Sequence, residues 1–346
     1  MYNFLINPSK LLFLMVMVLG SVISITSNSW PGIWMGLEIN LLAFIPLMNS
    51  KNNILSSEAS MKYFLVQAMA SSLFLMLIIT NLISLSSLED SMNSILNSLL
   101  ITSTLLIKMG AAPFHFWFPT VMEGLTWFNC LLLMTWQKLT PMLILSYLKI
   151  NEQFLLMIII TSVAIGSIGG LNQTSTRKIM AYSSINHIGW MLMAMLYSEI
   201  LWVNYFLIYS LISSLMMIFF LKTSNNHFNQ LSLKMNYNYP LKLLIMINML
   251  SLGGLPPFLG FMPKWLVIQS SLTNNMMLFT FFMVLLTLIT LFYYLRLSLT
   301  SLMMNNYQIK WLHENNVPSS FLLVTSSLSI LSLSGLILYP LTFYKF

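Results

Sequence analysis

The sequence predicts an all-α, polytopic membrane protein with about eleven transmembrane helices. Hydrophobic residues make up 58% of the 346-residue chain and charged residues only 7%, whereas soluble domains carry about 25% charged residues. Apolar stretches of roughly 20 residues, long enough to cross a bilayer as a helix, recur along the chain. Because no change in composition marks a boundary, residues 1–346 are interpreted as one transmembrane domain without a soluble domain.

Hydropathy separates the chain into eleven candidate spans. They cover residues 10–27, 30–49, 60–84, 95–117, 123–147, 153–171, 177–197, 200–222, 240–270, 275–298 and 318–341. The longest polar connections, 223–239 and 300–317, are rich in asparagine and lack nucleotide-binding glycines.

The basic residues of the connections predict the orientation of the chain. If the N-terminus lies on side A, ten of the fifteen basic residues also fall on side A, and Lys149 and Lys345 fall on side B. The ten are Lys10, Lys51, Lys62, Arg177, Lys178, Lys222, Lys234, Lys242, Arg296 and Lys310. Such an excess marks the cytoplasmic or matrix side. Topology therefore explains the net charge of +7, and a nucleic-acid partner is not expected.

Four ionisable residues lie in the middle of apolar spans. They are Glu38, Lys108, Lys138 and Lys264. A charged side chain at that depth costs at least about 2.5–3.5 kcal/mol, and such residues usually face water, a partner charge or an ion path. The pattern indicates a transporter of charge.

Two spans are predicted to be interrupted, each beside one of these lysines. The breaks contain Gly110 and Pro113 in the first span, and Gly253, Gly254, Pro256 and Pro257 in the second. A broken helix is tolerated in a bilayer only where it is packed in protein or lines water. Paired breaks in the two halves of a chain are typical of ion sites in inverted-repeat transporters. The alternative is a structural kink without transport.

The choice of lysine favours proton transfer. Desolvation disfavours the charged form of a side chain and a neighbouring opposite charge restores it, so a movable pair can load and unload a lysine. Arginine does not release its proton, and both arginines of the chain, Arg177 and Arg296, lie at span ends. Glu38 is expected to pair with Lys108, although a fixed salt bridge is the alternative. For Lys264 the alternative is snorkelling to an interface.

Further candidates are weaker. His187 lies in mid-span and could pass a proton between its two ring nitrogens, or it could be an ordinary buried histidine. His115 lies in the first break and could hydrogen-bond freed carbonyls. Glu123, at a span end, is interpreted as a cap rather than a lysine partner. The single cysteine, Cys130, is interpreted as a small buried hydrophobe, and no His or carboxylate pair has metal-ligand spacing.

Several segments, taken in order, resemble a known family. They are Trp34–Asn40, Lys108–Trp117, Trp136–Pro141, Ser183–Trp190 and Gly254–Trp265. They are similar to the subunit 2 family of mitochondrial NADH:ubiquinone oxidoreductase (respiratory complex I), an antiporter-like membrane-arm subunit, and most similar to its insect form. The resemblance covers the whole chain.

The resemblance implies a subunit of a proton-pumping translocase of the respiratory chain. The implied proton axis consists of Glu38, Lys108, Lys138, His187 and Lys264, with His115 and Glu123 as accessory candidates. It also implies that FMN, the iron–sulfur clusters and ubiquinone belong to other subunits, and that this chain has no redox centre.

The implied location is the mitochondrial inner membrane, with the N-terminus in the matrix and the C-terminus in the intermembrane space. The implied partners are other complex I subunits, including neighbouring antiporter-like and small membrane subunits, and lipids such as cardiolipin. The alternative function is a subunit of a cation/proton antiporter complex.

Overall fold

The computed structural model describes residues 8–50, 53–86, 91–148, 151–223, 226–227, 230, 239–303, 326, 329 and 333. These residues are helical apart from short connections and one isolated antiparallel bridge between Ser175 and His227. The chain divides into two compact units, residues 1–158 and residues 159–346.

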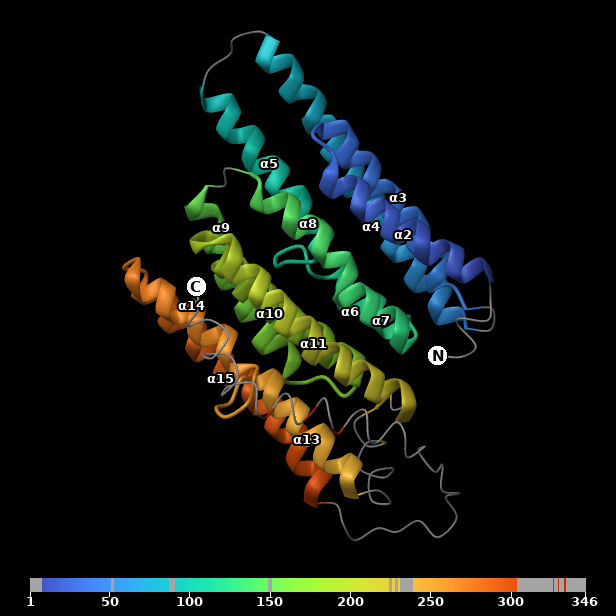
Figure 1. The fold of residues 1–346 in the computed structure, drawn as a ribbon, viewed down its shortest axis with the longest axis vertical. Coiled ribbons are helices and arrows are strands. Elements are labelled where there is room, and N and C mark those ends of the chain that lie inside the picture. Colours follow the sequence, from blue (N-terminus) through green and yellow to red (C-terminus); the bar gives the residue numbers. More distant parts are fainter. Residues whose placement is uncertain are drawn as a thin grey trace. The chain divides into compact units, whose positions relative to one another are not determined.

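Among the described residues, seven helices lie wholly within the first unit, and they are coloured blue to green in Figure 1. They are α2 (Pro8–Thr26), α3 (Trp30–Met48), α4 (Ile54–Ser86), α5 (Ser91–Met109), α6 (Trp117–Gly124), α7 (Trp127–Met134) and α8 (Trp136–Ser146). Helix α3 packs against α2 and α4, α4 also contacts α5 and α6, and α5 contacts α8. Ser29 caps α3 by accepting a hydrogen bond from the amide of Gly32, and Pro31 occupies its first turn, where no amide donor is needed.

Small residues let α2 and α3 approach closely. A Cβ atom added to Gly36 would lie 2.5 Å from the amide nitrogen of Ser24, and one added to Gly20 would lie 2.9 Å from that of Asn40. Glycine at such positions brings backbones together in membrane helix pairs. This contact holds α3, which carries Glu38, against α2.

Helix α9 (Glu152–Gly170) begins in the first unit and ends in the second. The second unit continues with α10 (Thr176–Tyr197), α11 (Glu199–Thr223), α13 (Tyr239–Gly253), α14 (Phe261–Thr273) and α15 (Met277–Met303). Helix α10 packs on α11 and α14, and α15 packs on α13 and α14. A Cβ atom on Gly166 of α9 would lie 2.6 Å from the amide nitrogen of Asn186 in α10, so this glycine serves close helix packing.

Large apolar side chains are exposed on the helix surfaces, and several polar and charged side chains are buried. The buried residues include three lysines and many serines and threonines, while Leu65, Met69 and Met76 of α4 are more than half exposed. A helix surface of this kind suits lipid or a partner helix. Together with the apolar helix lengths, it identifies a multi-pass membrane protein.

Seven helical segments of the described residues are long and apolar enough to cross a membrane. The eleven predicted spans are therefore not all recovered, for identifiable reasons. Within the predicted span 95–117 the helix α5 ends at Met109, and the predicted span 240–270 contains two helices, because α13 ends at Gly253 and α14 begins at Phe261. Helix α10, which corresponds to the predicted span 177–197, carries too many polar residues to count among these apolar helices. The predicted span 318–341 lies outside the described residues, apart from residues 326, 329 and 333.

The contact between α2 and α3 generates a stability prediction for Gly36→Ala. Alanine in a helix normally stabilises by about 0.5–1 kcal/mol relative to glycine, but overpacking a close contact costs about 1–3 kcal/mol. We expect the clash with Ser24 to outweigh the gain in helix propensity and to lower the melting temperature of the assembled protein. Gly253→Ala is the matched control, because the nearest neighbour of its added methyl would be 3.7 Å away. Equal melting temperatures for the two variants would contradict the prediction.

Candidate functional site

The first helix break follows Lys108, and three carbonyls of the last turn of α5, those of Leu106, Ile107 and Lys108, accept hydrogen bonds. Gly110 has φ +75°, a conformation that favours glycine, and its amide donates to the carbonyls of Leu106 and Ile107 at 3.0 and 3.1 Å. The indole of Trp117 also donates to Ile107 O, at 3.1 Å. The amide of Gln67 donates to Lys108 O at 3.3 Å. These bonds are what a broken membrane helix requires.

The second break repeats the features of the first at the same spacings along the chain. Gly254 has φ +77°, and its amide donates to the carbonyls of Leu250 and Ser251 at 3.1 and 3.0 Å. In both breaks a cis peptide bond precedes the proline three residues after this glycine, at Pro113 and Pro257. The next helix begins seven residues after it. Two segments that are far apart in the sequence therefore adopt the same backbone conformation.

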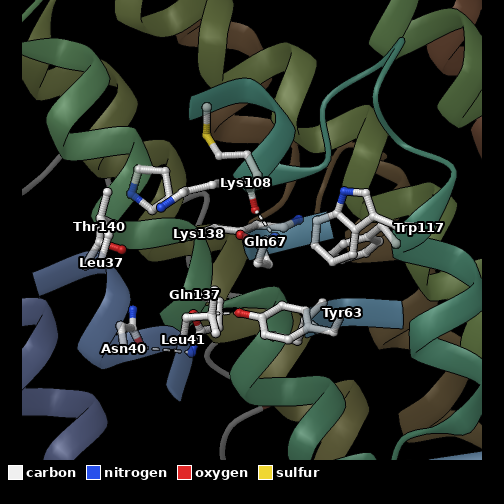
Figure 2. Close-up of a pocket in the computed structure, with 14 residues that line it drawn as sticks. Leu37, Asn40, Leu41, Tyr63, Gln67, Lys108, Trp117, Gln137, Lys138 and Thr140 are labelled. Atoms are coloured by element: carbon white, nitrogen blue, oxygen red, sulfur yellow. Dashed lines mark hydrogen bonds between the residues drawn. The ribbon is translucent and has the colours of Figure 1, made fainter. Parts of the chain in front are cut away.

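The two buried lysines of the first unit, Lys108 and Lys138, line one cavity, drawn in Figure 2. It offers about 20 Å³ to the centre of a water molecule, enough for about one water. Its lining residues are Leu37, Asn40, Leu41, Tyr63, Gln67, Lys108, Met109, Trp117, Phe118, Leu133, Gln137, Lys138, Thr140 and Pro141. The side chains of Lys108 and Lys138 are only 8% and 1% exposed.

The surroundings of the two lysines differ. The carboxylate of Glu38, which is half-buried on α3, lies close enough to Lys108 for a Coulombic interaction. The Lys108 ammonium lies 5.9 Å from the centroid of the Phe74 ring. The Lys138 ammonium lies 4.9 Å from the centroid of the Phe118 ring, within the range of a cation–π interaction. The structure thus brings together three of the five predicted relay residues in the first unit.

A chain of amide and hydroxyl groups runs beside these lysines (Figure 2). Gln137 donates to Asn40 Oδ1 at 3.0 Å and accepts from the Tyr63 hydroxyl at 3.4 Å. The buried hydroxyl of Thr140 has no hydrogen-bond partner among the described residues, which is typical of a group that binds water. The motifs of the sequence contain Asn40, Gln137 and Thr140, but Tyr63 and Gln67 carried no signal other than a polar group within an apolar span.

In the second unit Lys264 and His187 are both buried, at 6% and 7% exposure. Lys264 lies in the first turn of α14 and donates to Gly253 O at 2.9 Å, so its ammonium serves the second break and does not snorkel to a surface. His187 Nδ1 lies 2.9 Å from the hydroxyl of Tyr205, and the rings of His187 and Tyr209 have centroids 4.9 Å apart.

The weaker candidates lie near the first break. His115 Nδ1 lies 3.2 Å from Pro113 O, so this ring does contact a freed carbonyl. Glu123 lies in the last turn of α6, whereas the sequence placed it at the start of the following span. That boundary is wrong because the chain resumes as a helix at Trp117. Cys130 is buried, with Sγ 3.6 Å from Met122 O.

Comparisons with a family model, with related sequences and with solved structures agree. The family described as NADH:quinone oxidoreductase/Mrp antiporter, TM matches residues 27–290. The chain is 51% identical to the NADH-ubiquinone oxidoreductase chain 2 of Anopheles gambiae over 97% of this chain and 98% of that one. It is 44% identical to the protein of the same name from Locusta migratoria, with 97% of each chain covered. The predicted resemblance to the insect form is confirmed.

Solved structures share the fold. A chain of the respiratory complex I from Thermus thermophilus matches with a TM-score of 0.85 at 23% identity, covering 97% of this chain and 79% of that one. A chain of the Mrp complex from Dietzia sp. matches with a TM-score of 0.76 at 15% identity, covering 95% and 75%.

The second break generates a prediction for Gly254→Ala. A Cβ atom at this residue would lie 2.9 Å from Lys264 Nζ, and the left-handed conformation costs a non-glycine residue roughly 1–2 kcal/mol. We expect the variant to lose stability and to displace the ammonium from Gly253 O, as measured by thermal unfolding and a high-resolution map. Gly253→Ala, one residue earlier, should do neither. An unchanged Lys264 position in Gly254→Ala would contradict this reading.

Proposed function

The chain belongs to the NADH:quinone oxidoreductase/Mrp antiporter family, and from this membership we propose that it is a proton-translocating membrane-arm subunit of respiratory complex I. The extended identity to proteins named NADH-ubiquinone oxidoreductase chain 2 supports the assignment. One structural observation carries the mechanism. Two buried lysines line a cavity with room for water, and a carboxylate lies within electrostatic reach of one of them.

In the first unit, Glu38, Lys108 and Lys138 act as the proton-carrying groups. A proton on Lys108 is stabilised when Glu38 is ionised nearby and is released when that charge moves or is neutralised. Water in the cavity, bound by Thr140 and the lysines, passes the proton between Lys108 and Lys138. The Asn40–Gln137–Tyr63 chain holds the polar side of the cavity in place.

In the second unit, His187 and Lys264 continue the set. His187 can accept a proton at one ring nitrogen while it releases one from the other. Lys264 is held at the second break by Gly253 O. A carbonyl stabilises an ammonium group but does not lock it as a carboxylate would, so the lysine retains the ability to release its proton. His115 and Glu123 are accessory groups near the first break.

The matching breaks support inverted repeats, and about eleven membrane spans complete the fold. The protein lies in the mitochondrial inner membrane, with its N-terminus in the matrix and its C-terminus in the intermembrane space. Its partners are other complex I subunits, including neighbouring antiporter-like and small membrane subunits, and lipids such as cardiolipin. FMN, the iron–sulfur clusters and ubiquinone bind other subunits, and this chain contributes no redox centre.

The alternative, a subunit of a cation/proton antiporter complex, shares the fold. The likeness to the Mrp complex chain is only 15% in sequence, far below the identity to the complex I chains. The two functions differ in their driving reaction, because an antiporter exchanges protons for another cation without NADH.

Substitutions of Lys138 test the proposal. Lys138→Met removes the ammonium, and Lys138→Arg keeps a cation that does not release its proton. We expect both variants to lose most NADH-driven proton pumping in the assembled complex. The matched control is Lys62→Met, since Lys62 is exposed and forms an ion pair with Glu58 at 3.9 Å. Pumping is measured as protons translocated per NADH oxidised in sealed membranes.

The arginine variant separates two explanations. If the site needs only a static positive charge, Lys138→Arg retains pumping while Lys138→Met loses it, and the proton-carrier role is wrong. If both variants assemble and pump normally, Lys138 has no part in translocation.

A further inference from the structure

Gln67 is a buried polar residue of helix α4. It is only 4% exposed, whereas Leu65 and Met69 of the same helix are more than half exposed. Burying a side-chain amide is costly unless the amide is hydrogen-bonded. Gln67 lines the cavity that contains Lys108 and Lys138, and its amide donates to Lys108 O at 3.3 Å, as the dashed line in Figure 2 shows. The amide is therefore a partner of the first helix break.

The two helix breaks have different side-chain donors at a carbonyl of the last turn before the break. In the second break, Gly253 O accepts from the Lys264 ammonium at 2.9 Å. In the first break, Lys108 O accepts from the neutral amide of Gln67. A hydrogen bond from a charged donor is shorter and stronger than one from a neutral donor. A carbonyl beside a break is thus a favourable site for a lysine ammonium, and in the second break one occupies it.

The first unit also has a lysine ammonium beside its break. Lys138 is 1% exposed and lines the same cavity as Gln67. Its ammonium lies 4.9 Å from the centroid of the Phe118 ring, a contact that stabilises a cation without a hydrogen bond. A carbonyl left open in this cavity would compete with the ring for the ammonium, because a hydrogen bond from an ammonium is a strong one.

We propose that Gln67 is a positioning residue for Lys138. By occupying Lys108 O with a neutral donor, Gln67 keeps this carbonyl from binding the Lys138 ammonium. The ammonium then stays over the Phe118 ring, where it can exchange its proton with water in the cavity. The inference rests on the proposed proton-pumping function and adds a reason for the difference between the breaks: the carbonyl is occupied by an amide in the first unit and by the lysine itself in the second.

The test is Gln67→Met in the fully assembled complex, which removes the amide donor and keeps an unbranched side chain of similar length. We expect a high-resolution map to show the Lys138 ammonium within hydrogen-bond distance of Lys108 O and no longer over the Phe118 ring. NADH-driven proton pumping should slow by about tenfold, since the ammonium must first leave the carbonyl. A tenfold change in rate corresponds to about 1.4 kcal/mol.

Two further variants are measured in parallel. Gln67→His keeps an N–H donor on a side chain of similar reach, so it should retain most of the pumping and leave the Lys138 ammonium over the ring. Gln269→Met is the matched control, because it removes the amide of an exposed glutamine of α14 and should leave pumping unchanged.

Normal pumping in Gln67→Met overturns the inference. Slower pumping with the Lys138 ammonium still over the Phe118 ring also overturns it, because that result indicates a loss of stability alone. If Gln67→Met does not assemble, Gln67→Asn takes its place, since its amide is one methylene too short to reach Lys108 O. The same two measurements then decide, and normal pumping or an unmoved ammonium overturns the inference.

These outcomes are distinguishable from failure of the proposed function. If Lys138→Met loses pumping and Gln67→Met does not, only the role of Gln67 is wrong. If Lys138→Met pumps normally, the proposed function is wrong. The position of the ammonium in the Gln67→Met map then still decides whether Gln67 keeps Lys138 away from Lys108 O.

Discussion

The free-energy cost of burying an ionisable group away from water determines the surroundings of the three buried lysines. Three lysines are less than a tenth exposed, in a chain whose outer surface carries leucine, methionine and phenylalanine. An uncompensated charge in such surroundings costs several kcal/mol. Each lysine has a different means of compensation: a carboxylate within Coulombic reach at Lys108, an aromatic face at Lys138 and a backbone carbonyl at Lys264.

The helix breaks supply part of that compensation. A continuous helix uses all its interior carbonyls within its own backbone, whereas a broken helix frees some of them. In the first break the freed carbonyls accept from Trp117 and Gln67. In the second break Gly253 O accepts from Lys264. The two breaks share one backbone geometry, but their freed carbonyls have different donors. In the first unit the donors are neutral side chains, and in the second unit the donor is a titratable lysine.

The sequence predicted the helical membrane class, the multi-pass organisation and the family, because apolar length and short motifs are local properties. The boundaries were less accurate around Glu123, since a hydropathy window does not register a helix that restarts at Trp117 after seven non-helical residues. The relay roles of Glu38, Lys108, Lys138, His187 and Lys264 remain predictions, although the structure places each of them in a polar or buried setting.

The polar neighbours were harder to foresee. Tyr63 and Gln67 lie in the apolar span of α4, and Tyr205 and Tyr209, which contact His187, lie in that of α11. Nothing local to these spans separates a packing tyrosine from a functional one. Only the tertiary fold shows that the hydroxyl of Tyr205 on α11 lies 2.9 Å from His187 Nδ1 on α10. Long-range juxtapositions of this kind have no counterpart in hydropathy or in residue spacing.

The contact between Gly254 and Lys264 has an evolutionary consequence. The lysine stem and ammonium occupy the space that a side chain at residue 254 would need, so the two positions share one volume. A lineage that enlarges residue 254 must first shorten or redirect residue 264, and a lineage that keeps a long cation at 264 is confined to glycine at 254. Substitutions at residues 254 and 264 are thus expected to be correlated among related proteins. Intermediates that carry only one of the two changes are expected to be rare.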